Sequence, residues 1–208
     1  MALPKIFNGA RMTVDKLPDL YLALRMLGDQ RVLAGVPAER VRRQKGTISN
    51  AALAYIHENG APEAHIPPRP YLVPAVAGMK AEIVRFLGMA GTMALNGNPS
   101  GVQRALNALG LTAQNRIRAM INAGVPPPLA ASTLRGRIRA RTAIKGAKAE
   151  LARRDAGGEA GMDLAKPLIA TGQLRNSMTY VIRSMLWKES LRVGKPGSTE
   201  KWNEQFSK

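Results

Sequence analysis

The sequence predicts an α+β fold in which a small antiparallel sheet is packed by helices, with long helical and extended arms. Apolar residues recur at helical spacing over several segments, whereas only three short stretches alternate in the manner of a strand. Hydrophobic residues make up 45% of the 208-residue chain, which is enough for one core. We expect a core domain built from residues 1–134 and 166–193, a basic insertion arm over 135–165 and a C-terminal tail over 194–208.

A helix and a strand are predicted to come first. Leucines recur at helical spacing over 17–28, between Asp15 as a candidate N-cap and Gly28 as a candidate stop. Small apolar residues then alternate over 31–36, and the proline that follows closes a strand. We expect a basic loop over 38–47.

A rigid corner over residues 48–74 is the feature around which the chain is predicted to fold. Its first part is a short apolar helix, and Gly60 can take the positive φ that ends a helix. Prolines on both sides of Arg69 then fix φ, so we expect this side chain to be held outward on a stiff extended rod. We interpret Arg69 as an interface or anchoring residue rather than a catalytic one.

Two longer helices are predicted after the corner. Apolar residues trace one face over 74–95 and a second face over 102–121. Gly110, with Thr112 as a new N-cap, is compatible with a division of the second helix. An extended proline spacer over 125–129 follows, and the next two hydroxyl residues, Ser132 and Thr133, are candidate caps.

The most unusual composition lies between Arg135 and Arg154, where eight basic residues accompany a single acid, Glu150. As a helix this stretch has a narrow stripe of small residues, and as a strand it has four arginines on one face. Both forms could contact phosphates, and both leave little apolar area. We expect a projecting arm packed on a neighbouring subunit, with a solvated basic helix as the alternative. The eight residues are Arg135, Arg137, Arg139, Arg141, Lys145, Lys148, Arg153 and Arg154.

A flexible link over 155–161 is expected to lead back to the core, where Thr171 is a candidate N-cap of a short helix. Alternation predicts a strand over 178–186 and a second strand over 191–193 that pairs back. The tail carries two aromatic side chains four residues apart. A short tail helix would present both of them to a groove on another chain.

Charge and composition limit the partners. Lys and Arg number 31 against 14 Asp and Glu, a net charge of +17, which favours nucleic acid or acidic protein neighbours; a basic solvated surface explains it equally well. Cysteine is absent, the N-terminus lacks the apolar region of a signal peptide, and no segment approaches the roughly 20 apolar residues of a membrane span. We expect a soluble chain made in a reducing cytoplasm, with no membrane contact.

Residues of the kinds that carry catalysis or bind metals are few. His57 and His65 are the two histidines, and no cysteine can join them as a ligand. Together with Glu58 and Glu63 they match no zinc or hydrolase spacing, and a polar turn explains them better. No phosphate-binding loop, dinucleotide fingerprint or nucleophile elbow occurs. We therefore expect no enzymatic activity, no catalytic residue, no metal and no cofactor.

Four sequence blocks follow one another along the chain: AYIHENGAP, IPPRPYLVPAV, PPPLAASTL and KPLIATGQLRNSMTYVIR. Taken together and in this order, they resemble the bacteriophage head-tail joining and tail-completion family of neck proteins. The resemblance implies an α+β fold and a place in the virion, as a ring between the portal and the tail tube. It implies no cofactor and no catalysis. The sequence departs from the family pattern over 134–166, where the basic arm replaces a much shorter connection.

A ring protomer needs rigid corners and arms that reach its neighbours, because a heterologous contact closes only at the right rotation. We therefore expect a homo-oligomeric tail terminator or head-tail connector that meets other neck, portal-proximal or tail-tube proteins and surrounds passing double-stranded DNA. The alternatives are a nucleic-acid-binding protein and an assembly chaperone that uses 135–154. The predicted interface residues are Ile66, Pro67, Pro68, Arg69, Pro70, Tyr71, Trp202 and Phe206.

Overall fold

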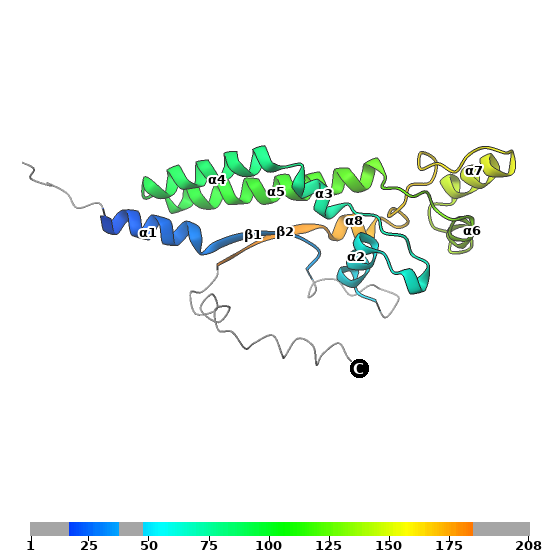
Figure 1. Cartoon of the computed structure of the whole chain (residues 1–208), viewed down its shortest axis with the longest axis horizontal. Coiled ribbons are helices and arrows are strands. Elements are labelled where there is room, and N and C mark those ends of the chain that lie inside the picture. The colour runs from blue at the N-terminus through cyan, green and yellow to red at the C-terminus, as the bar shows by residue number, and fades with distance from the viewer. Residues whose placement is uncertain (1–16, 38–47, 185–208) are drawn as a thin grey trace, which may run out of the picture.

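A computed structural model describes residues 17–37 and 48–184 of the chain. The predicted basic loop over 38–47, the predicted strand over 191–193 and the aromatic tail residues Trp202 and Phe206 lie outside the described residues. Figure 1 shows an elongated molecule in which α4 and α5 run side by side along the long axis, with α1 at one end and α6 and α7 at the other. The predicted fold class is confirmed, because a small antiparallel sheet is packed by helices.

The described residues form eleven helices, turns and strands. In chain order they are α1 (Leu17–Gly28), β1 (Gln30–Gly35), α2 (Asn50–Asn59), the 3-10 turn η1 (Pro62–Ala64), α3 (Leu72–Ala77), α4 (Lys80–Leu95), α5 (Pro99–Ala123), α6 (Ala131–Arg139), α7 (Ile144–Asp155), α8 (Gln173–Ser177) and β2 (Thr179–Ser184).

The sheet joins the first described strand to the last one. β1 and β2 are antiparallel, and Val32 lies opposite Ile182 in the register. Both of these side chains pack against the helices, whereas Leu33 and its partner Val181 point to the other face and are exposed. The strand predicted over 178–186 is thus confirmed over its central residues, and the alternation of side chains has the expected effect.

Helix α5 is the centre of the core. Its buried residues recur at helical spacing and contact α3, α4 and both strands. The expected division near Gly110 does not occur, since the helix is continuous from Asn98, its N-cap, to Gly124. The hydroxyl of Thr112 donates 2.8 Å to the carbonyl of Ala108 inside the helix, so it does not start a new one. At Gly110 the missing side chain instead makes room for the ring of Tyr180 on β2.

The helix predicted over 74–95 is two helices. α3 ends at Gly78, whose N–H donates 3.0 Å to the carbonyl of Pro74, and α4 begins after Met79. Met79 is fully buried with Phe86 and Leu109, so the break turns a large side chain into the core. The apolar face predicted over 74–95 is thus divided between α3 and α4, and the physical reason is the burial of Met79.

The predicted basic arm is the helix pair α6 and α7, so the strand alternative was wrong. The pair has a small core of its own around Leu134 and Ala147, more apolar contact than the sequence suggested. α6 begins after Ala130, which places both candidate caps, Ser132 and Thr133, in its first turn. Likewise α8 begins after Gly172, one residue later than predicted from Thr171.

Replacement of Gly110 by alanine tests the contact between α5 and the sheet. An added Cβ would overlap the Tyr180 ring, which is held by a 3.1 Å hydrogen bond from its hydroxyl to Asn107. We expect Gly110→Ala to destabilise the protein by about 1–3 kcal/mol in urea unfolding, in spite of the better helix propensity of alanine. Gly88→Ala is the control, because it meets nothing within 4 Å and should stabilise by about 0.5–1 kcal/mol. Equal effects of the two changes would contradict this account.

Candidate functional site

The corner begins with a helix that is capped at both ends. The Ser49 hydroxyl accepts a 3.1 Å hydrogen bond from the N–H of Ala52, and α2 ends at Gly60 with φ 79°. A Cβ at Gly60 would lie 2.8 Å from the backbone nitrogen of Pro68, so both the φ angle and the close approach of the chain require glycine. The predicted helix stop is confirmed.

Glu58 determines where the next helix starts. Its carboxylate accepts hydrogen bonds of 2.8, 2.9 and 2.9 Å from the N–H groups of Tyr71, Leu72 and Val73, the first turn of α3. A carboxylate at this place satisfies donors that have no partner inside the helix. Burial and then the Glu58 charge raise the pKa of the Tyr71 hydroxyl, which donates to the Ala54 carbonyl. Sequence analysis missed this role, because Glu58 and α3 are separated by the whole corner.

Arg69 points inward, so the expectation that the rod holds it outward was wrong. The side chain is 6% exposed, and its Nε and Nη2 donate 3.1 and 3.3 Å to the carbonyls of Pro127 and Pro128. Its own N–H donates 2.7 Å to the carbonyl of His57. These bonds tie the corner to the proline spacer after α5, which agrees with an anchoring role. Burial lowers the pKa of the guanidinium.

A second buried arginine lies close to the first. Arg137 on α6 is 8% exposed, and its Nη1 donates 3.0 Å to the carbonyl of Lys166. Burial, and then the positive charge of Arg69, lower the pKa of Arg137. Two cations therefore approach each other inside the protein. Neither is paired with a carboxylate among the described residues.

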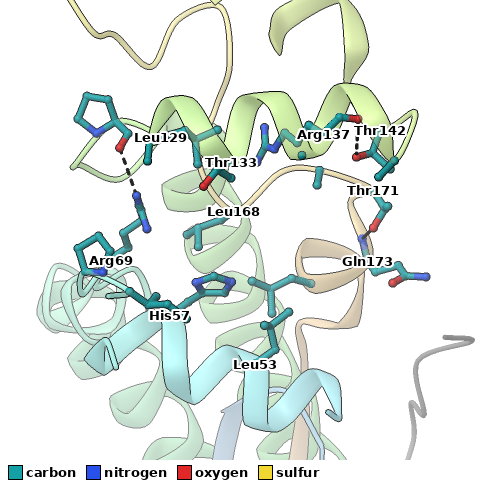
Figure 2. Close-up of a pocket in the computed structure, with 18 of the residues that line it drawn as sticks. Leu53, His57, Arg69, Leu129, Thr133, Arg137, Thr142, Leu168, Thr171 and Gln173 are labelled. Atoms are coloured by element: carbon teal, nitrogen blue, oxygen red, sulfur yellow. Dashed lines mark hydrogen bonds between the residues drawn. The ribbon is translucent and has the colours of Figure 1, made fainter. Parts of the chain in front are cut away.

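Both arginines line a pocket of about 630 Å³ between α2, α6 and the segment before α8. Figure 2 shows Arg69 beside Leu129 on one side and Arg137 on α6 on the other, with Thr133 between them in this view. No acidic residue belongs to the described lining, which contains His57 and His65 together with apolar and hydroxyl or amide side chains. These are Leu53, Ile66, Leu129, Leu168, Thr133, Thr142, Thr171 and Gln173.

The structure distributes the predicted interface residues over three environments. Ile66 and Pro67 line the pocket with Arg69, and Tyr71 lies in the core with Ile117 and Ile121. The remaining two described members of the set, Pro68 and Pro70, are exposed. The subunit interface at the corner therefore stays a prediction, and two exposed prolines are its most accessible part.

Three of the eight basic residues in the predicted arm make contacts inside the protein. Arg137 is buried in the pocket, and Arg153 and Arg154 are half-buried and bind the carboxylate of Glu150. The N–H of Gly161 donates 2.9 Å to the same carboxylate, which ties down the link predicted to be flexible. Five basic side chains of this set remain exposed: Arg135, Arg139, Arg141, Lys145 and Lys148.

Burial alone would raise the pKa of the fully buried Glu150. The hydrogen bonds from Gly161 and Arg154 and the charge of Arg153 outweigh that effect, and the pKa lies below its ordinary value of 4.5. A carboxylate whose pKa is lower in the folded state stabilises the fold above its unfolded pKa, and this contribution disappears as the pH falls through the folded pKa. Glu150 therefore stabilises the α6–α7 unit at neutral pH.

Replacement of Glu150 by glutamine tests this charge. We expect Glu150→Gln to cost about 2 kcal/mol at pH 7, because hydrogen bonds from two arginines to a charged acceptor are weakened. The difference from the wild type should shrink as the pH falls well below 4.5. Thermal unfolding followed by circular dichroism at several pH values measures both effects. Glu159→Gln, at an exposed position, is the control; a pH-independent difference for Glu150→Gln would contradict the charge-based explanation.

Metal-ligand clusters and membrane-spanning helices are both absent from residues 17–37 and 48–184. No group of three or more histidine and carboxylate side chains there is placed to hold a metal ion. No helix in those ranges combines the length and the apolar character that a bilayer crossing requires. Comparisons with protein-family models, curated proteins and solved structures find no match for this chain.

Proposed function

We propose that this chain is a structural neck protein of a tailed bacteriophage, a tail-completion or head-tail connector component that assembles as a ring in the virion. The resemblance of its four sequence blocks supports this assignment. The single structural observation that carries it is an exposed apolar face on α4. Its partners in this proposal are further copies of the chain and the neighbouring portal-proximal and tail-tube proteins.

The outer face of α4 is apolar where a solvated helix would be polar. Val84 is 72% exposed and Leu95 is 59% exposed, and the two lie about 20° apart around the helix axis. Gly88 and the exposed Leu87 lie next to them, whereas Phe86 on the inner face is buried. Contiguous exposed apolar surface marks interaction sites.

The shape of the molecule also suits a ring. α4 lies along the outer edge of the long axis, antiparallel to α5 (Figure 1), so a neighbour that covers it would bury a long strip of each protomer. A contact between this face and a different patch of the next protomer is heterologous, and such contacts form a ring when their rotation closes. The exposed Leu33 and Val181 on the open sheet face supply a candidate complementary patch.

A charge on the α4 face tests the ring. We expect Val84→Glu to convert the assembly to monomers in native mass spectrometry, because it buries a carboxylate in an apolar contact. The monomer should keep its stability within about 0.5 kcal/mol, since the side chain is exposed. Met89→Glu is the matched control, at an exposed apolar residue about 140° away around the same helix. If Val84→Glu assembles as the wild type does, the proposed interface is contradicted.

The second candidate function is binding to the backbone of nucleic acid through α6 and α7. The five exposed basic side chains of the predicted arm favour it, and they allow fewer contacts than the sequence suggested. An assembly chaperone is the third possibility. Purified virions separate it from the first proposal, because a chaperone is absent from the finished particle and a neck protein is present.

Salt dependence tests the contact with nucleic acid. Five phosphate contacts predict that affinity for duplex DNA falls about 500-fold between about 50 and 200 mM salt. Lys145→Gln with Lys148→Gln should lower the slope of log affinity against log salt by about 2. Fluorescence anisotropy with a labelled duplex measures the affinity at each salt concentration. Arg31→Gln with Arg183→Gln, an exposed pair on the sheet, is the control of equal charge change. An affinity for duplex DNA that does not change with salt concentration would rule this function out.

A further inference from the structure

We propose that the pocket lined by Arg69 and Arg137 binds a small ligand that joins an oxyanion, a carboxylate or a phosphate, to an apolar body. Ligand binding here is independent of the proposed function, because it depends on the charge, the free donors and the lining of this pocket and not on the α4 face. This binding role differs from the anchoring role of Arg69, because it uses the guanidinium N–H groups that the anchoring hydrogen bonds do not use.

Arg69 and Arg137 have no carboxylate partner among the described residues. As whole residues they are more than nine-tenths buried, and the charge of Arg69 acts on Arg137. Buried cations are normally paired, because removal of a charge from water costs several kcal/mol. Backbone carbonyls of Pro127, Pro128 and Lys166 accept some of the N–H groups, but carbonyls carry no net negative charge. The described part of the pocket thus lacks the counterion that its two cations require.

Both guanidinium groups have N–H donors that the described hydrogen bonds do not use. A guanidinium has five N–H groups. The described hydrogen bonds use two of them at Arg69 and one at Arg137. The remaining groups belong to side chains that line the cavity. Planar guanidinium edges match carboxylate and phosphate oxygens.

The size and lining of the pocket suit a small organic molecule. About 630 Å³ is far more than a bare ion needs, and it lies in the range of small-molecule pockets. Leu53, Leu129 and Leu168 form apolar walls, and Thr171 and Gln173 add hydrogen-bonding groups. A ligand with an anionic head and an apolar body therefore fits this lining better than inorganic phosphate alone.

Calorimetric titration of the full chain with 3-phenylpropionate, acetate and inorganic phosphate tests the pocket. We expect saturable binding, with phenylpropionate at least ten-fold tighter than acetate because of the apolar walls. Saturation below about 1 mM supports a free small ligand. Saturation only at tens of millimolar supports the same chemistry presented by a carboxylate side chain that a neighbouring chain holds at high local concentration. No saturable binding of any probe up to about 100 mM overturns the proposal.

Two substitutions in the first turn of α6 show whether the arginines are responsible. Thr133 lines the pocket and Ser132 does not, so Thr133→Glu and Ser132→Glu add the same charge to the same helix end. We expect Thr133→Glu to raise the unfolding temperature relative to Ser132→Glu and to weaken phenylpropionate binding at least ten-fold, because its carboxylate occupies the site. Ser132→Glu should bind within two-fold of the wild type. Equal affinity and equal stability of the two variants would overturn the assignment.

Arg137→Gln provides a second test of the same site. It should weaken phenylpropionate binding at least ten-fold, whereas Arg135→Gln, at an exposed position of the same helix, should leave binding unchanged. If Arg137→Gln does not fold, Thr133→Glu still decides the question, because it keeps both arginines. Loss of the ring in Val84→Glu would not alter any of these outcomes, so failure of the proposed function and failure of this inference are distinguishable.

Discussion

The carboxylate of Glu58 is the contact on which the architecture depends. It accepts three backbone N–H groups at the start of α3, donors that no helical carbonyl can satisfy. Because α2 carries Glu58 and α3 leads into α4, this one side chain sets the direction in which the α4–α5 layer leaves the corner. The same contact seats Tyr71 in the core beside Ile117 and Ile121 of α5. The prolines of the corner stiffen a turn whose direction is set by the Glu58 carboxylate.

Charge inside the protein is arranged in two contrasting ways. At Glu150 the buried acid binds Arg153, Arg154 and the N–H of Gly161, and Asp163 also pairs with Arg153. Two cations therefore meet two carboxylates, and the α6–α7 unit is stabilised at neutral pH. Around the pocket, Arg69 and Arg137 are buried with backbone carbonyls as their described partners. The contrast between a balanced cluster and an unbalanced one is what separates a structural role from a binding role here. Because these arginines are buried or paired inside the protein, less basic surface is open to nucleic acid.

The two proposed surfaces lie in different parts of the elongated molecule. The apolar face belongs to α4, whereas the pocket lies near the end where α6 and α7 are found (Figure 1). A protomer built in this way can contact a neighbour along α4 without covering the arginines. Assembly and anion binding are therefore separable properties in our proposals, and single substitutions address them one at a time.

The sequence by itself determined the class of the fold and most of the elements. Helical periodicity, the alternation over the two described strands and the stop at Gly60 are local signals, since they depend on neighbours within one or two turns. Tertiary structure alone decided that α5 stays continuous past Gly110, where the ring of Tyr180 needs the space, and that Met79 divides the helix before it. It also decided that Glu58 caps α3 and that Arg69 and Arg137 share one pocket. Those side chains meet partners that are distant along the chain, and no local pattern records which distant groups will come together.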